Sequence, residues 1–183
     1  MITKIVITGG PCAGKTTALS WIQNVFTEKG YHVLFIPETA TELIPNGIAP
    51  WTCKTIKDFQ MAAIKLQKEK EKIFEKAAES YIENEKVLIV CDRGTMDAKG
   101  FMNHNEFYEM LSDLNLTEVI ERDNYDAVFH LVSAAKGAEE FYTLENNTAR
   151  TETVEEAAAV DDRLIHAWTG HPHLRVFDNS TDF

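Results

Sequence analysis

The residues with the most specific spacing lie near the start of the chain. Eight of them follow the pattern G-x-x-x-x-G-K-[ST], in the order Gly9-Gly10-Pro11-Cys12-Ala13-Gly14-Lys15-Thr16. Glycines allow successive backbone N–H groups to turn toward phosphate oxygens, and a helix that follows directs its positive N-terminal end at the same anion. The pattern predicts a phosphate-binding loop (P-loop), and the alternative is a glycine turn that carries a chance lysine.

Side chains of this loop have separate predicted roles. Lys15 supplies a positive charge to the β- and γ-phosphates of a nucleotide, and the Thr16 hydroxyl ligates magnesium. We expect the ligand to be ATP, or else GTP, bound with Mg²⁺, and we expect Thr17 to reach its α-phosphate. The predicted nucleotide-binding residues of this segment are Gly10, Pro11, Cys12, Ala13, Gly14, Lys15, Thr16 and Thr17.

An acidic residue ends an apolar run farther along the chain. Asp92 comes directly after the run at residues 87–91 and directly before Arg93. A carboxylate at the carboxyl end of a buried strand near a P-loop is a common second anchor for magnesium, and an adjacent arginine can hold a phosphate with two N–H groups. The alternative for this pair is a helix cap followed by a surface arginine.

Three more charged residues are candidates for phosphoryl transfer. Glu38 follows the apolar run at residues 33–36, where a carboxylate can accept a proton from a hydroxyl that attacks the γ-phosphate, with a helix-capping glutamate as the alternative. Arg150 lies in a long polar segment, where an arginine on a closing lid would stabilise charge on the transferred group. Arg163 is a weaker candidate, and a surface arginine is the alternative for both. The predicted catalytic residues are Lys15, Glu38, Arg93 and Arg150, and the predicted metal ligands are Thr16 and Asp92.

Short apolar runs predict the strands that position these side chains, at residues 5–7, 33–36, 87–91, 126–132 and 174–177. Helices are expected at residues 14–29, at 55–84 as one helix or two, and at 157–168. Strands that are apolar on both faces and alternate with helices are typical of a parallel sheet covered on both sides.

The expected fold is therefore α/β: a three-layer P-loop NTPase with a parallel five-stranded sheet, in one domain over residues 1–183. Two polar stretches are candidates for mobile loops over a site. One covers residues 45–54, and the other covers residues 145–156, within a lid expected at about residues 135–156.

Composition excludes several classes of protein. The chain of 183 residues is 44% hydrophobic and carries a formal net charge of −11, which argues against a general nucleic-acid binder. The three cysteines lack metal-ligand spacing and read as free thiols in a reducing cytosol. His171-Pro172-His173 has no carboxylate or cysteine partner at ligand spacing. The apolar N-terminus is too short for a signal peptide and no stretch is long enough to cross a bilayer, so we expect a cytoplasmic protein without stable membrane insertion.

The order of these motifs resembles the nucleoside and nucleotide kinase branch of P-loop proteins. Within that branch the chain resembles the NadR-like AAA family ATPase domain, a family that includes the nucleotide-binding domain of the photoreceptor translocation-defect protein. The stretches that carry the resemblance spread over nearly the whole chain, at residues 8–17, 37–40, 91–94 and 176–183. The Asn-Lys-x-Asp guanine reader of regulatory GTPases is absent from the sequence, which argues against a Ras-like switch.

The resemblance implies roles for several of the candidates already named. In deoxynucleoside kinases the acid after the second strand is the base toward the sugar hydroxyl, and Glu38 matches that place. Asp92-Arg93 is similar to the acid–arginine pair that follows their third strand, and Arg150-Thr151-Glu152 is similar to their lid.

Two further pairs gain a role only through the resemblance. Phe59-Gln60 is similar to a Phe-Gln pair that reads the acceptor base, with plain helix surface as the alternative. Asp182-Phe183 is similar to the end of a loop that packs on the donor base, and these two residues complete the predicted nucleotide-binding set.

Two functions remain open at this point. The first is a kinase that transfers the γ-phosphate to an unidentified small-molecule acceptor such as a nucleoside. The second is a nucleotide-dependent regulatory module that binds a protein or an acidic lipid headgroup. The lysines at residues 65, 68, 70 and 72 do not support a lipid patch, because Glu69 and Glu71 are interleaved with them as on a solvated helix face. Neither the acceptor nor the oligomeric state follows from the sequence.

Overall fold

A computed structural model describes residues 1–81, 85–137 and 153–179. Five strands form one parallel sheet in the order β2-β3-β1-β4-β5. Their bounds are β1 Ile2–Gly9, β2 Tyr31–Ile36, β3 Lys86–Asp92, β4 Ala127–Leu131 and β5 Leu174–Phe177. The predicted α/β fold and its parallel five-stranded sheet are confirmed.

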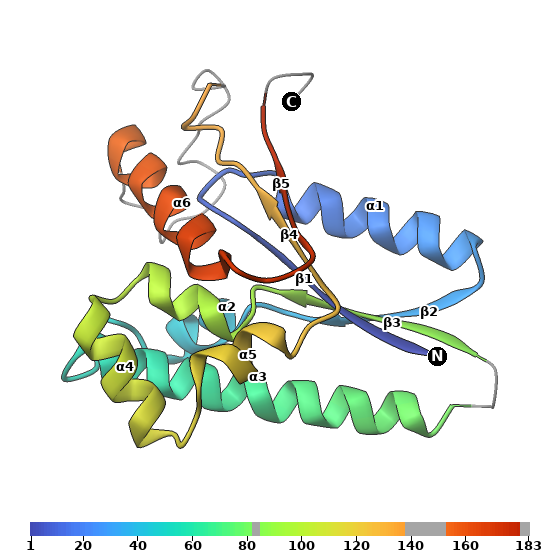
Figure 1. The fold of residues 1–183 in the computed structure, drawn as a ribbon, viewed down its shortest axis with the longest axis horizontal. Helices are drawn as coiled ribbons and strands as arrows, with labels where there is room; N and C mark the ends of the chain where they lie inside the picture. Colours follow the sequence, from blue (N-terminus) through green and yellow to red (C-terminus); the bar gives the residue numbers. More distant parts are fainter. Residues whose placement is uncertain (82–84, 138–152, 180–183) are drawn as a thin grey trace.

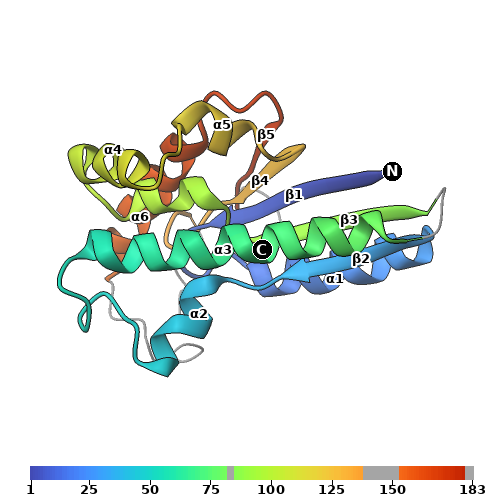
Figure 2. The same cartoon turned by 90° about the horizontal axis from the view of Figure 1, so that it is seen from below.

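Helices cover both faces of this sheet. Helix α1 lies on one side and α3 on the other, which gives the three layers seen in Figure 1 and, from below, in Figure 2. Within the described residues the α-helices are α1 Lys15–Glu28, α2 Thr39–Leu43, α3 Ile56–Glu79, α4 His104–Asp113, α5 Glu118–Asp123 and α6 Val154–Trp168. There are also two short 3₁₀ helices in the described ranges: η1 Ile44–Asn46 lies between α2 and α3, and η2 Thr95–Gly100 lies between β3 and α4.

The strand register gathers the functional candidates at one edge of the sheet. Strand β1 is central, and Ile7 pairs with Asp92 of β3 while Ile36 of β2 pairs with Cys91. The carboxyl ends of these three parallel strands therefore lie together. The P-loop, Glu38 and Asp92 leave the sheet at this same edge, which is where α/β folds bind their ligands.

Two apolar clusters hold the layers together. One lies between the sheet and the helices that include α3 and α6, with Val6, Ile36 and Trp168 fully buried. The other lies under α1 and contains Ile7 and Ile22. The central strands are apolar on both faces because each face is covered, as the continuous apolar runs predict.

The prediction of which side chains of the long helix α3 face the solvent was partly wrong. Glu71 was expected on a solvated helix face, yet it is only 3% exposed, whereas the apolar side chain of Ile73 on the same helix is 62% exposed. Glu71 accepts hydrogen bonds from Lys4 (3.1 Å) and from the Tyr125 hydroxyl (2.8 Å). These partners satisfy its charge inside the core, so burial of the carboxylate is tolerated.

No helix in the described ranges is long and apolar enough to span a membrane.

Candidate functional site

The P-loop connects β1 to α1 through a backbone that few residues can adopt. Gly9 has a φ of 150°, and a Cβ atom there would lie 2.2 Å from the Leu131 carbonyl oxygen. Cys12 takes a left-handed φ of 53°. The first N–H groups of α1, which begins at Lys15, have no partner within the helix and are the natural donors to a phosphate.

The Lys15 ammonium group folds back over the start of its own loop. Its Nζ donates to the carbonyl oxygens of Gly9 (3.4 Å) and Gly10 (3.2 Å). Burial, followed by the charge of the nearby Arg93, lowers the pKa of Lys15 to about 8 against the opposing effect of the neighbouring carboxylates. The protein groups around this lysine therefore hold it only weakly in its charged form.

Nucleotide affinity should consequently depend on pH. Phosphate groups raise the pKa of Lys15, so binding takes up a proton wherever the free lysine, with its pKa of about 8, is neutral. Affinity is at its full value below pH 8 and falls above it by up to about tenfold per pH unit. Titrations of the nucleotide between roughly pH 6.5 and 9.5 measure this slope. Lys15→Arg keeps its charge throughout that range, and an unchanged slope in this variant would contradict the assignment.

Arg93 joins two carboxylates at the end of β3. Its Nε donates to Glu38 Oε1 (2.6 Å) and its Nη1 donates to Asp97 Oδ1 (3.3 Å). Burial alone would lower the pKa of Arg93, but the Glu38 and Asp97 charges outweigh it and raise that pKa above its ordinary value. Arg93 is therefore not a surface arginine. Glu38 stands at the N-cap position of α2, yet its side chain makes no capping bond and binds Arg93 instead.

Sequence reasoning missed Asp97, which is 3% exposed in η2. Besides Arg93, its carboxylate accepts hydrogen bonds from the Thr8 hydroxyl, the Gly94 N–H (2.8 Å) and the Trp168 indole N–H (3.2 Å). It thus ties β1, the turn after β3 and α6 to one point. A local signal exists in the spacing of Gly94 and Asp97, which form a capping arrangement at the start of η2.

Asp92 has the properties of an oxygen ligand for a cation. Burial, followed by the charge of Glu38, raises the pKa of Asp92. Its Oδ1 atom is buried and has no hydrogen-bond partner among the described residues. A hard cation would satisfy this oxygen and favour its charged form. The described part of the chain contains no cluster of three or more His, Cys, Asp or Glu side chains able to hold a metal, but Mg²⁺ at phosphates commonly takes only one or two protein ligands.

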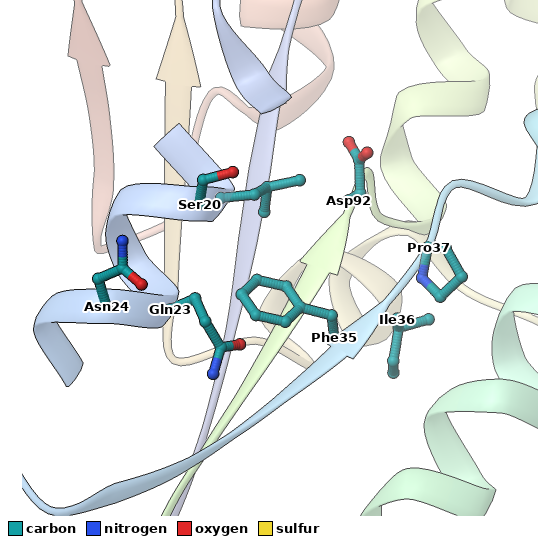
Figure 3. A pocket seen from close by; sticks show the side chains of 8 residues that line it. Ser20, Gln23, Asn24, Phe35, Ile36, Pro37 and Asp92 are labelled. Atoms are coloured by element: carbon teal, nitrogen blue, oxygen red, sulfur yellow. The ribbon is translucent and has the colours of Figure 1, made fainter. Parts of the chain in front are cut away.

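A cavity of about 1010 Å³ connects the P-loop with the Glu38–Arg93 pair. Phe59 and Gln60 of α3 line it and are 4% and 9% exposed, so the alternative of plain helix surface is wrong for both. A second, smaller cavity of about 450 Å³ lies between α1 and β2. Figure 3 shows Gln23, Phe35 and Asp92 around it. Asp92 lines both cavities.

Several predicted site residues are not placed at this site by the structure. Arg150, Asp182 and Phe183 lie outside the described residues. Thr16 lines the larger cavity although it is exposed at the start of α1, whereas the exposed Thr17 beside it does not line that cavity. Arg163 is exposed, and its Nε donates to the Gly100 carbonyl oxygen (2.8 Å), so it links α6 to η2.

The parallel sheet and the loop at its edge define a P-loop nucleotide-binding protein with a kinase-like α/β fold. The chain belongs to the AAA domain family, whose model matches residues 4–183. Membership in this family implies nucleotide binding.

Among solved structures, the chain is similar to deoxyadenosine kinase from M. mycoides with bound dATP. The TM-score is 0.62 at 18% sequence identity, and the match covers 99% of this chain and 93% of that one. At this identity the likeness concerns the fold alone. No curated protein matches the sequence.

Proposed function

We propose that this protein is a magnesium-dependent kinase that transfers the γ-phosphate of ATP to a hydroxyl group of a small, nucleoside-like molecule. The observation that carries the proposal is the position of Glu38. Its carboxylate lines the same cavity as the P-loop and is held by Arg93 at 2.6 Å. A fixed carboxylate beside a phosphate site is the arrangement that phosphoryl transfer to a hydroxyl requires.

In the proposed reaction, the acceptor hydroxyl oxygen forms a bond to the γ-phosphorus while the bond from that phosphorus to the bridging oxygen of ADP breaks. The hydroxyl proton passes to Glu38. Lys15, Arg93 and Arg150 are the proposed stabilisers of charge on the transferred group. Thr16 and Asp92 are the proposed ligands of Mg²⁺, which neutralises charge on the β- and γ-oxygens when it is bound.

Glu38 and Arg93 have to part at least briefly for this reaction. In the structure Arg93 donates to the carboxylate that is to receive the proton. A hydroxyl group that binds Glu38 replaces this N–H donor and frees the guanidinium for phosphate oxygens. Asp97 keeps its own contact with Arg93 (3.3 Å), so the guanidinium stays anchored while it changes partner.

Gln60 supports an acceptor with a hydrogen-bonding edge. Its side chain lines the cavity, is 9% exposed and has no hydrogen-bond partner in the described ranges. A primary amide offers a donor and an acceptor side by side, and buried amides are rarely left unpaired. Phe59, its neighbour in the cavity wall, supplies an aromatic surface. A planar ring with adjacent donor and acceptor atoms, as in a nucleobase or an aromatic carboxamide, matches both groups.

Replacing Gln60 with leucine should raise the KM for the acceptor about 10- to 100-fold and leave kcat less affected, since a polar edge of the acceptor loses its partner. Steady-state kinetics at saturating ATP measure the change. Gln23→Leu is the matched control, because Gln23 lines only the smaller cavity between α1 and β2. Equal changes in KM for the two variants would argue against a role for Gln60 in acceptor binding.

The proposed function is tested by ADP release in the presence of a panel of nucleosides and related ring compounds, with ATP and Mg²⁺. Stimulation by one acceptor, together with a phosphorylated product, supports the kinase. If no acceptor accelerates ADP release and Glu38→Gln leaves basal turnover unchanged, the proposal is wrong and a nucleotide-dependent binding module is favoured.

A further inference from the structure

The first half of the P-loop is bound to protein groups rather than open to a ligand. The Gly10 N–H donates to Asp161 Oδ1 of α6 (2.9 Å). The Pro11 carbonyl accepts from the Ser133 hydroxyl, and the Cys12 carbonyl accepts from the Ala134 N–H (3.3 Å). Gly10 therefore has no N–H left for a phosphate, and Pro11 has none at all.

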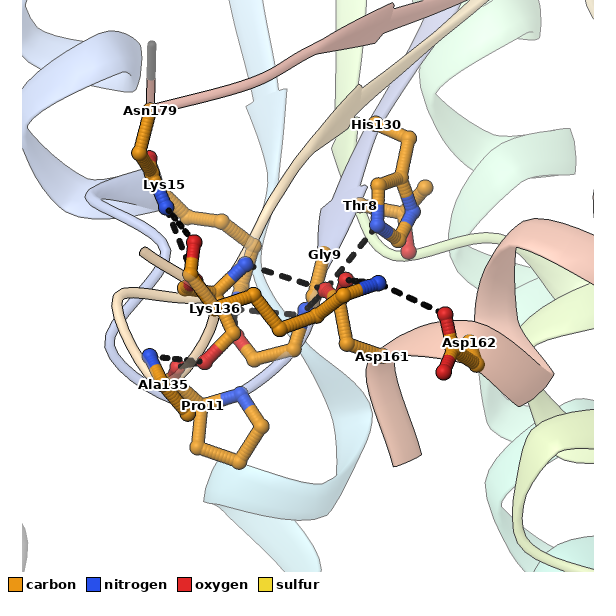
Figure 4. A network of polar contacts seen from close by, with 12 residues as sticks. Thr8, Gly9, Pro11, Lys15, His130, Ala135, Lys136, Asp161, Asp162 and Asn179 are labelled. Atoms are coloured by element: carbon orange, nitrogen blue, oxygen red, sulfur yellow. Dashed lines mark hydrogen bonds and ion pairs between the residues drawn. The ribbon is translucent and has the colours of Figure 1, made fainter. Parts of the chain in front are cut away.

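Asp161 is the centre of this attachment, as Figure 4 shows. Its side chain is fully buried, and its Oδ1 accepts from Gly10, from the Ser133 N–H (3.1 Å) and from His130 Nε2 (3.0 Å). Its Oδ2 lies 3.4 Å from Lys136 Nζ. Burial alone would raise the pKa of Asp161, but the hydrogen bond and charge of His130 and the two backbone N–H groups outweigh it and hold that pKa below its ordinary value.

Gly10 lies too close to α6 to carry a side chain without displacing its neighbours. A Cβ atom at Gly10 would lie 2.8 Å from Asp161 Oδ1 and 3.0 Å from the Ser133 Cβ. Gly10 does not have a positive φ, so a side chain is excluded by this contact and not by backbone conformation. The sequence motif permits many residues at this position, and here Asp161 explains the glycine.

We propose that Asp161 is a positioning residue for nucleotide binding: it fixes the leading half of the P-loop so that the N–H groups of residues 13–16 stay aimed at the β-phosphate. The N–H groups at the start of α1 bind an anion well only when their directions converge, and the loop that precedes them sets those directions. An acidic side chain is otherwise unfavourable so near a phosphate site, and the hydrogen bond from His130 and the charge of Lys136 offset this cost. The inference rests on the nucleotide-binding part of the proposed function and does not require an acceptor.

The experiment compares a nucleoside diphosphate with its monophosphate, both with Mg²⁺, using whichever of ADP and GDP the wild-type protein binds more tightly. The dissociation constant of the monophosphate divided by that of the diphosphate measures the contribution of the β-phosphate to binding. Asp161→Ala should weaken diphosphate binding about tenfold or more and monophosphate binding much less, so the ratio falls. Asp161→Asn should retain most of the affinity, because its amide oxygen can still accept from the Gly10 N–H.

Two further variants separate positioning from general packing. Leu164→Ala removes a fully buried side chain from the same helix without touching the loop, and it should lower stability while leaving the ratio unchanged. Gly10→Ala leaves Asp161 in place but forces the loop away from it, and it should reproduce the fall in the ratio. If Asp161→Ala does not fold, the ratio measured for Gly10→Ala is the test of the inference.

The inference is overturned if the ratio is unchanged in folded Asp161→Ala. If that variant does not fold, an unchanged ratio in Gly10→Ala overturns it. An equal fall of the ratio in Leu164→Ala overturns it as well. These outcomes are independent of the kinase proposal. Failure to phosphorylate any acceptor leaves the diphosphate measurement intact, whereas a normal ratio in the variants leaves acceptor phosphorylation intact.

Discussion

Glu38→Gln is expected to lower acceptor-dependent ADP release by about 10²- to 10⁴-fold, the range typical for loss of a general base. Glutamine keeps the shape of the side chain and can still accept the Arg93 N–H, but it cannot take the hydroxyl proton. Nucleotide affinity should stay close to that of the wild type, because the P-loop is untouched. Single-turnover measurements with saturating acceptor separate this loss from slow product release.

Glu42→Gln is the matched control for this variant. Glu42 lies one turn farther along α2, where it pairs with Lys70 and does not line the cavity. Its replacement should leave turnover nearly unchanged. Equal rates for Glu38→Gln and Glu42→Gln would exclude Glu38 as the base, and a thermal unfolding curve for each confirms that both variants are folded.

Arg93→Ala is expected to reduce the free energy of unfolding by about 3 kcal/mol, because it leaves carboxylates in a mostly buried cluster without their cation. The side chains of Arg93 and Asp97 are only 17% and 5% exposed, so water screens this loss weakly. Denaturant titration monitored by tryptophan fluorescence measures the change. Its midpoint should shift without a change in slope if only stability is affected.

Arg93→Gly separates the effect of losing the charge from the effect of backbone strain at this position. Arg93 adopts a left-handed φ of 68°, which alanine tolerates poorly and glycine readily. The glycine variant should therefore be more stable than the alanine variant by about 1 kcal/mol, although it also lacks the guanidinium. If the two variants are equally stable, the backbone at this position is not strained and the whole loss belongs to the carboxylate cluster.

The strands and the P-loop could be predicted because their signals are local. A buried parallel strand has to be apolar on both faces, and the runs at residues 33–36 and 87–91 became β2 and β3 within two residues at either end. The glycine-lysine pattern places its own loop between a strand and a helix. Glu38 and Asp92 could be placed at one edge of the sheet because parallel strands share a direction.

Buried carboxylates could not be predicted in the same way. Helical periodicity assigns charged residues to the solvent face, yet Glu71, Asp97 and Asp161 are nearly or fully buried. Their partners include Lys4, Thr8 and Gly10, which are distant in sequence. A single sequence does not reveal such pairings, because neither partner carries a local signal that the other exists.

The helices α4 and α5 were missed for another reason. The sequence between the turn after β3 and β4 has no long apolar period, and its helices span only residues 104–113 and 118–123. One available signal was the capping box in which Asn103 and Glu106 exchange hydrogen bonds at the start of α4. Short helices of this kind depend on packing against neighbours rather than on their own propensity.

The ion pair between Glu38 and Arg93 has a consequence for how much ATP the protein hydrolyses without an acceptor. If Glu38 is the base, a water molecule has to compete for its carboxylate with the Arg93 N–H that binds it at 2.6 Å. Water is a poor competitor, whereas an acceptor held by other contacts in the cavity is a good one. Hydrolysis of ATP by water would then be slow, and ATP would be consumed mainly when the acceptor is bound.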